Sequence, residues 1–493
     1  MKKIFIYVIA SFLILSSCSK IDFGDINKNP NGASDPNLAA LMTGATMRYA
    51  TLTGREYLTK PVLYVQYMSQ VTYTDEMLYN NAPSTWYGYY IQTLSNYQTI
   101  INVASDKANW DGPIETSGYH ANQVGVATIM KCVVFKRVTD EFGDIPYSEA
   151  LDNKISTPKY DDQESIYKDL ISKVKAARDM LDASKLGPVG DPIYNGNVTK
   201  WKKFANSFLL TLSLQLSKKF PSASGYAATE FKAALNDPNG VIENVGDEAW
   251  FSYDPVHNFV NPWSRLRPTD YFLSKEFTDA LHGNTGAGSL NPTSNKTPDS
   301  RANIFMDDPT LDGVPYGYAN GSGNGKASMS SLIWAEKPPL PLMTAAYTYL
   351  NRAEAAARGW TSENAQDLLV AGIKASYASL SNAYGVDITA DADAYANARV
   401  ADIATAPGGI QQVIAEEKWV ALFPKGFQEW SEWRRTDYPK LKPAHDYQNS
   451  GVIPRRLPYP AEEAGLNPDG YKYGVDALSP QKDLNSSRFW WDK

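Results

Sequence analysis

The chain has 493 residues, of which 43% are hydrophobic, and a formal net charge of −7. It contains no block of basic residues, so the composition does not indicate a nucleic-acid-binding surface. Besides Cys18 the only cysteine is Cys132, which excludes an internal disulfide framework; we expect Cys132 to be a small core residue.

The N-terminal stretch has the features of an export signal with a lipid-attachment site. Lys2 and Lys3 precede an apolar run, residues 4–15, that is shorter than the roughly 20 residues needed to span a membrane. The sequence LSSC, ending at Cys18, resembles a bacterial lipobox. We therefore predict a lipoprotein signal peptide at residues 1–17 and a lipidated Cys18 with a linker at 18–37. A plain secretory signal with an incidental cysteine is the alternative.

The rest of the chain, residues 38–493, is predicted to be mainly α, because helical periodicity is frequent and alternating strand patterns are few. Two pairs of adjacent segments suggest tetratricopeptide-like helical hairpins, 163–184 with 199–219 and 342–359 with 364–380. Gly359 and Gly426 are read as helix stop signals, and Pro424 as a limit to its helix. The predicted helices are Leu38–Thr51, Thr85–Ala104, Asn122–Phe142, Gln163–Ser184, Thr199–Lys219, Leu342–Gly359, Asn364–Leu380 and Ile410–Phe423.

A long insertion, about residues 241–340, separates the hairpins. Its middle is rich in glycine, asparagine and serine, so it cannot form a packed core by itself. Long loops in compact proteins tend to be either disordered or functional, and aromatic neighbours such as Trp263 and Trp334 favour function here. We expect it to form the ligand-binding part.

Motifs for catalysis or cofactor binding are weak. GSGNGK, residues 321–326, lacks the first glycine and the Ser/Thr of a phosphate-binding loop, and the four histidines have no metal-ligand spacing. The carboxylates that a glycoside hydrolase would need are not excluded by the sequence. Those of Glu416, Glu417, Glu429, Glu432 and Asp437 lie beside Lys and Arg, which favours ion pairing. We predict no enzymatic activity, no cofactor and no metal.

Five stretches together resemble one family, the SusD/RagB-like nutrient-binding outer-membrane lipoproteins, and within it the starch-binding, outer-membrane-associating subgroup. They are RVTDEFGDIPYSEAL (137–151), WKKFANSFLLTLSLQLS (201–217), PLMTAAYTYLNRAEAAARGW (341–360), EEKWVALFPKGFQEWSEWRRTDYP (416–439) and PRRLPYPAEE (454–463). Tyr347 departs from the family, which commonly has Glu there. Physically, Arg434 and Arg435 are expected to stack on Trp430 or Trp433 and to pair with Glu429 or Glu432.

The resemblance implies a lipoprotein facing the cell exterior at the outer membrane. Its partner would be a SusC-like TonB-dependent transporter, to which it passes a captured oligosaccharide or peptide without catalysis. Two alternatives stay open: a surface glycoside hydrolase or lyase, and a scaffold lipoprotein that binds another protein.

In this family, ligand contacts come from loops near the first helical hairpin and from the long insertion. Aromatic planes accept the apolar faces of sugar rings, while amide and guanidinium groups bind hydroxyls. Trp86 has an alternative role as a core residue at a helix entry. The candidate ligand-binding residues are Tyr73, Tyr79, Trp86, Asn261, Trp263, Arg267 and Tyr318.

Overall fold

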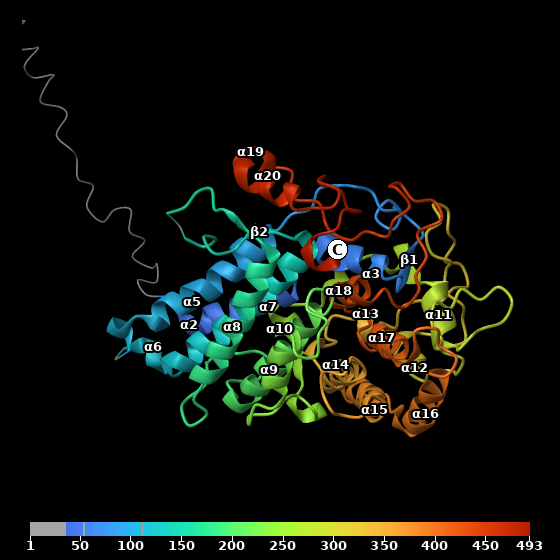
Figure 1. The fold of residues 1–493 in the computed structure, drawn as a ribbon, viewed down its shortest axis with the longest axis horizontal. Helices are drawn as coiled ribbons and strands as arrows, with labels where there is room; N and C mark the ends of the chain where they lie inside the picture. Colours follow the sequence, from blue (N-terminus) through green and yellow to red (C-terminus); the bar gives the residue numbers. More distant parts are fainter. Residues whose placement is uncertain (1–35, 53–54, 111, 153) are drawn as a thin grey trace, which may run out of the picture. The chain divides into compact units, whose positions relative to one another are not determined.

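The computed structural model describes residues 36–493, except residues 53–54, 111 and 153 (Figure 1). The predicted signal peptide, Cys18 and nearly all of the linker lie outside these residues. Leu38–Lys493 forms one compact unit. In the described part of the chain, none of the helices combines the length and the apolar character that a membrane span requires.

Helices dominate the N-terminal half of this unit, as the sequence predicts. In α8 the buried residues Ile166, Leu170 and Val174 recur at helical spacing, and the Asp162 side chain caps the first turn by accepting from the Ser165 N–H. The helical elements are α2 (Leu38–Ala50), η3 (Arg55–Thr59), α3 (Lys60–Tyr64), α4 (Tyr87–Tyr89), η4 (Tyr90–Leu94), α5 (Ser95–Ser105), η5 (Lys107–Asn109), α6 (Pro113–Thr116), α7 (His120–Phe142), α8 (Gln163–Met180), α9 (Val198–Gln215) and α10 (Tyr226–Leu235).

The C-terminal part is also helical. Gly359 follows α14 with a φ of 71°, a conformation that glycine adopts easily, and the predicted stop is confirmed. The prediction for Gly426 is wrong: it opens α18 and packs directly against Val62. The elements are α14 (Ala345–Ala357), α15 (Ala365–Tyr384), η10 (Thr389–Asp391), α16 (Ala392–Asp402), α17 (Gly409–Ala421), α18 (Gly426–Thr436), α19 (Glu463–Leu466), α20 (Pro468–Asp476) and η11 (Trp490–Asp492).

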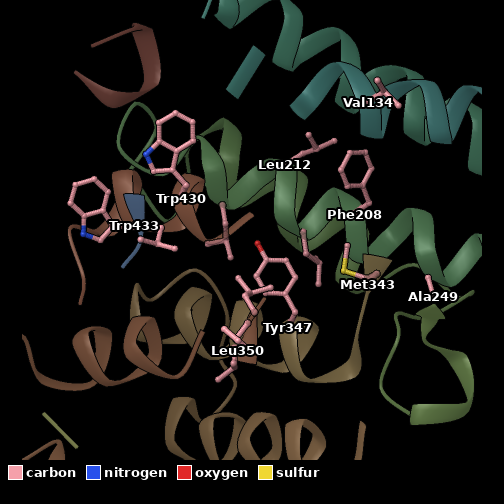
Figure 2. Close-up of a cluster of buried hydrophobic side chains, with 14 of the residues drawn as sticks. Val134, Phe208, Leu212, Ala249, Met343, Tyr347, Leu350, Trp430 and Trp433 are labelled. Carbon is pink, nitrogen blue, oxygen red and sulfur yellow. The ribbon is translucent and has the colours of Figure 1, made fainter. Parts of the chain in front are cut away.

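Neighbouring helices pack in pairs: α8 contacts α9, and α14 contacts α15, as the two predicted hairpins require. The mainly α class is confirmed. A shared core fills the space between α7, α9, α14 and α18 (Figure 2). There the Tyr347 hydroxyl donates to Glu432 (2.6 Å) and accepts from the Gln428 amide (2.8 Å), so this departure from the family makes a defined buried contact.

The region between α10 and α14 is mostly irregular, with short elements only. They are η6 (Val245–Asp247), β4 (Ala249–Phe251), η7 (Pro255–His257), η8 (Pro262–Arg265), η9 (Pro268–Asp270), β5 (Tyr271–Leu273), α11 (Lys275–Leu281), α12 (Ala302–Phe305), α13 (Ser331–Trp334) and β6 (Leu340–Met343). In β4 and β6, which pair antiparallel, Phe251 lies opposite Leu340. The strands β2 (Ile145–Pro146) and β3 (Tyr160–Asp161) form another small antiparallel pair.

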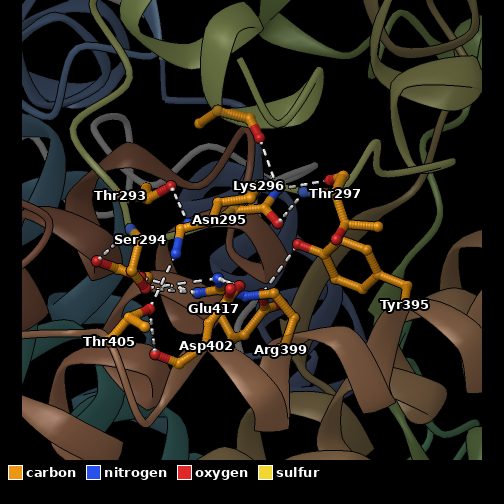
Figure 3. A network of polar contacts seen from close by, with 12 residues as sticks. Thr293, Ser294, Asn295, Lys296, Thr297, Tyr395, Arg399, Asp402, Thr405 and Glu417 are labelled. Atoms are coloured by element: carbon orange, nitrogen blue, oxygen red, sulfur yellow. Dashed lines mark hydrogen bonds and ion pairs between the residues drawn. The ribbon is translucent and has the colours of Figure 1, made fainter. Parts of the chain in front are cut away.

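Buried ion pairs attach this irregular region to the helices. Arg399 of α16 binds Glu416 (2.8 Å) and Glu417 (2.7 Å) of α17, and the Ser294 N–H donates to Glu416 (2.9 Å) (Figure 3). Arg301 reaches the same Glu417 at 2.7 Å. These contacts hold the loop that contains Ser294 and Arg301 against helix α17. The predicted ion-pairing role of Glu416 and Glu417 is confirmed.

The arginines of α18 divide the predicted roles: Arg434 stacks and Arg435 forms ion pairs. The predicted pairing of Glu429 is wrong, because neither of its carboxylate oxygens has a hydrogen-bond partner among the described residues. The Arg434 guanidinium lies 3.8 Å from the Trp430 ring centre, and Arg435 pairs with Glu432 and Glu354. Both arginines are fully buried, so these contacts are architectural. Cys132 is buried in α7, as predicted.

Candidate ligand-binding site

A short sheet brings the loop after α3 next to the insertion. Strand β1 (Met68–Gln70) pairs antiparallel with β5, and Gln70 lies opposite Tyr271. Directly after the strand, the Val71 N–H donates to the Asp270 carbonyl (3.0 Å). The two regions from which the sequence predicts ligand contacts are therefore adjacent.

Three aromatic rings follow one another from this sheet into the insertion. The Tyr271 and Trp334 ring centres are 6.5 Å apart, and those of Trp334 and Trp263 are 5.3 Å apart. Tyr271 and Trp334 are half-buried, whereas Trp263 is only 4% exposed. The rings of Tyr271 and Trp334 therefore keep part of their surface open to solvent.

A second group of rings lies on the loops beside β1. Tyr73 is 68% exposed, and Tyr318, 43% exposed, stacks on His445 with ring centres 4.4 Å apart and an interplanar angle of 17°. The Thr74 hydroxyl donates to the Ala319 carbonyl at 3.5 Å, which joins the loop of Tyr73 to that of Tyr318. We call the residues of both groups that reach solvent the aromatic surface; they are Tyr73, Tyr271, Tyr318, Trp334 and His445.

Tyr79 was predicted to stack on ligand, but the structure places it inside the protein. The residue is fully buried between Tyr64 and Tyr316, and its hydroxyl accepts from the Ala444 N–H (3.0 Å). Burial raises the pKa of its phenol. No face of this ring is open to a ligand; its position fixes the loop that carries Tyr73.

Trp86 lies apart from the aromatic surface. It is 9% exposed and packs edge-on against Tyr90, Phe142 and Tyr459. It lines a hollow of about 430 Å³ between α5, the loop after β2 and α19, and this hollow shares no lining residue with the cleft beside Trp263. The structure thus does not bring Trp86 and Trp263 together, and the packing around Trp86 fits the alternative role as a core residue.

The two polar candidates differ in exposure. Asn261 is 5% exposed, and its amide donates to the carbonyls of Ile333 (2.7 Å) and Ala335 (2.9 Å), which positions Trp334 between them. The Arg267 side chain is 67% exposed and pairs with Asp270 at 3.2 Å. Arg267 is therefore available to bind a hydroxyl group beside Tyr271, whereas Asn261 has a positioning role.

Sequence reasoning did not nominate Tyr271, Trp334 or His445. In the sequence, Trp334 stands out only as an aromatic neighbour of the insertion, and His445 is one of four histidines without metal-ligand spacing. Their partners are distant in sequence, so only the pairing of β1 with β5 and the Tyr318–His445 stack reveal them. In the described residues, no group of three or more His, Cys, Asp or Glu side chains is arranged to hold a metal ion.

Comparison with known families identifies the family to which this chain belongs. Residues 30–460 match the profile of SusD-like proteins, described as starch-binding and associating with the outer membrane. The chain belongs to the SusD-like family. Membership explains the tetratricopeptide-like helix pairs with a long insertion, and it places the chain among outer-membrane-associated nutrient-binding proteins.

Solved SusD-like structures share this fold over nearly the whole chain. A chitin-binding protein is 28% identical, with a TM-score of 0.76, and the match covers 93% of this chain and 100% of that one. A chitin-binding SusD homologue from Flavobacterium johnsoniae is 24% identical (TM-score 0.73; 92% and 98% covered). A SusD homologue from Bacteroides fragilis is 22% identical (TM-score 0.76; 93% and 100% covered). The last two show the fold alone. A search of curated proteins gives no significant match.

Proposed function

We propose that this SusD-like protein binds an oligosaccharide at the aromatic surface without catalysis and passes it to a TonB-dependent outer-membrane transporter. The observation that carries the proposal is the gathering of exposed rings from separate loops, above all Tyr73 and Tyr318. Aromatic planes accept the apolar faces of pyranose rings. A few such contacts give free energies of about −4 to −8 kcal/mol, which corresponds to millimolar to micromolar affinity and allows release.

Two findings support a glycan rather than a peptide as the ligand. The family profile is described as starch-binding, and the 28% identical structure is that of a chitin-binding protein. The exposed guanidinium of Arg267 is already paired with Asp270, so it does not call for a charged ligand. Neutral chito-oligosaccharides and malto-oligosaccharides are the first ligands to test.

Three of the five carboxylates singled out in the sequence are committed to buried ion pairs, which supports binding without hydrolysis. Glu416, Glu417 and Glu432 are buried and held by arginine or lysine. A glycosidase needs two carboxylates that face the scissile bond from opposite sides. These carboxylates stabilise the fold instead.

The test is a panel of soluble ligands: chitohexaose, maltoheptaose and a casein digest, each titrated by calorimetry. We expect one glycan class to bind and no reducing ends to be released during overnight incubation. Release of reducing ends would support the hydrolase alternative, and binding of peptides alone would overturn the glycan proposal. Co-purification with a barrel of transporter size after detergent extraction tests the partner, since a scaffold lipoprotein would lack it.

A further inference from the structure

A cleft on the inner side of Trp263 contains a buried lysine. The cleft is a cavity of about 70 Å³ that opens to solvent at its mouth. Its walls are mostly apolar and come from α2, η3, η8, β6 and α18. They include Leu52, Leu58, Trp263, Ile333, the run Pro338–Pro341 and Phe427. Only two lining residues are basic, Arg137 and Lys425, and none is acidic.

Lys425 has no carboxylate partner among the residues that the structure describes. It is 8% exposed, its Nζ donates to the Leu342 carbonyl (2.9 Å), and it also lines a smaller inner hollow. Its two cationic neighbours on α7 have partners of their own: Lys136 binds Asp140 (2.6 Å), and Arg137 binds Glu141 (2.9 Å). The other ionisable groups around these hollows are tyrosine phenols, those of Tyr49, Tyr57, Tyr253, Tyr347 and Tyr384.

This arrangement favours a neutral amine. Burial, with repulsion from Lys136 and Arg137, lowers the pKa of Lys425 to about 7. A buried ammonium without a counter-ion is unfavourable because it loses hydration without gaining an ionic contact. An anion placed beside Nζ would supply that contact and restore the charge.

We propose that this cleft binds a small apolar molecule that carries one carboxylate, with the carboxylate against Lys425 Nζ and the apolar body along Trp263 and the proline run. Short fatty acids and arylalkanoic acids are the chemical class. The proposal does not rest on the glycan function, because neither Lys425 nor Pro338–Pro341 belongs to the aromatic surface.

The test uses octanoate and its uncharged analogue octanamide on the wild-type mature domain. Calorimetric titration at pH 8 in two buffers of different ionisation enthalpy measures the protons taken up on binding. We expect octanoate to bind with uptake of close to one proton, because it recharges Lys425, and octanamide to bind weakly without uptake. Absence of octanoate binding, binding without proton uptake, or equal binding of octanamide would each overturn the proposal.

Two variants test whether octanoate binds at Lys425. Lys425→Met keeps an unbranched apolar side chain and should weaken octanoate about tenfold to a hundredfold, with octanamide unchanged. Lys337→Met is the matched control, since Lys337 is exposed and precedes the proline run. An equal loss of octanoate affinity in both variants would show that binding depends on the overall charge of the protein rather than on Lys425, and it would contradict the proposal. The proton uptake of the wild-type protein decides the question even if Lys425→Met fails to fold.

Discussion

Tyr73 and Tyr79 lie in one loop and have the same chemistry, yet Tyr73 is 68% exposed and Tyr79 is fully buried. Both have positive φ angles, 53° and 68°, so the chain turns sharply at each position. Composition and spacing cannot tell which side of such a turn faces solvent. The sequence therefore identified the loop, whereas the choice between its tyrosines depends on contacts with Tyr316 and Ala444, which are distant in sequence.

Glu429 gives a prediction at the residue scale. It is fully buried, and neither carboxylate oxygen has a hydrogen-bond partner among the described residues. Burial, with repulsion from Glu432, raises its pKa well above the usual value. The folded state therefore keeps a proton that the unfolded chain releases, so this group lowers the free energy of unfolding as the pH rises above the ordinary glutamate pKa.

We expect Glu429→Gln to raise the free energy of unfolding by about 1 kcal/mol or more at pH 8, and by less at pH 5. Urea unfolding at both pH values measures this difference. The exposed residue Glu462 provides the control, because Glu462→Gln should change stability little at either pH. An equal loss of stability at both pH values in Glu429→Gln would contradict the proton linkage.

At the scale of elements, the eight helices predicted from periodicity are present, because apolar spacing and capping residues such as Asp162 are local signals. Helix α18 was not predicted as an element, since Gly426 at its start looks like a stop signal. The paired strands have two to four residues each, too short for an alternating pattern to be visible. The contacts that hold the insertion against the helices could not be predicted from the sequence either. They depend on ion pairs of Arg399 and Arg301 with carboxylates of α17.

The anchoring network leads to a prediction for Arg399→Met. The guanidinium is fully buried and binds Asp402, Glu416 and Glu417. Arg301 still pairs with Glu417, but the loss of Arg399 leaves Asp402 and Glu416 without a counter-ion among the described residues. We expect a loss of about 3 to 5 kcal/mol in the free energy of unfolding. Faster proteolysis of the loop around Ser294 should accompany it.

Chemical denaturation with limited proteolysis checks this expectation. The exposed pair Lys374–Asp393 (2.8 Å) is the control, and Lys374→Met should cost less than about 1 kcal/mol. Similar costs for the two variants would show that the Arg399 network does not hold the insertion.

At the scale of the whole molecule, the site is assembled from loops that meet only after folding. The family resemblance pointed to the loop after the first helices and to the insertion, and the structure brings these two regions together. The resemblance did not identify Tyr271, Trp334 or His445, because no sequence pattern indicates that their loops are adjacent in the folded protein. Trp86, nominated from the same region as Tyr73, belongs to a different surface.

Membrane attachment is a further prediction for the whole molecule, and it rests on the lipobox-like LSSC because Cys18 lies outside the described residues. We expect the wild-type protein to enter the detergent phase in a Triton X-114 partition and to incorporate labelled palmitate. Cys18→Ser should remain in the aqueous phase without label, since about 0.8 kcal/mol of membrane affinity per buried CH₂ is lost. Unlabelled wild-type protein in the aqueous phase would favour the plain secretory signal.

The most direct test of the glycan site is calorimetry with the glycan that binds in the panel, comparing wild type with the Tyr73→Ala/Tyr318→Ala double variant. Tyr473→Ala is the control, because Tyr473 is 49% exposed on α20 and is not part of the aromatic surface. We predict that the double variant, folded as judged by its melting transition, binds about tenfold more weakly or worse, with the control unchanged. Wild-type affinity in the folded double variant would contradict a binding site at the aromatic surface.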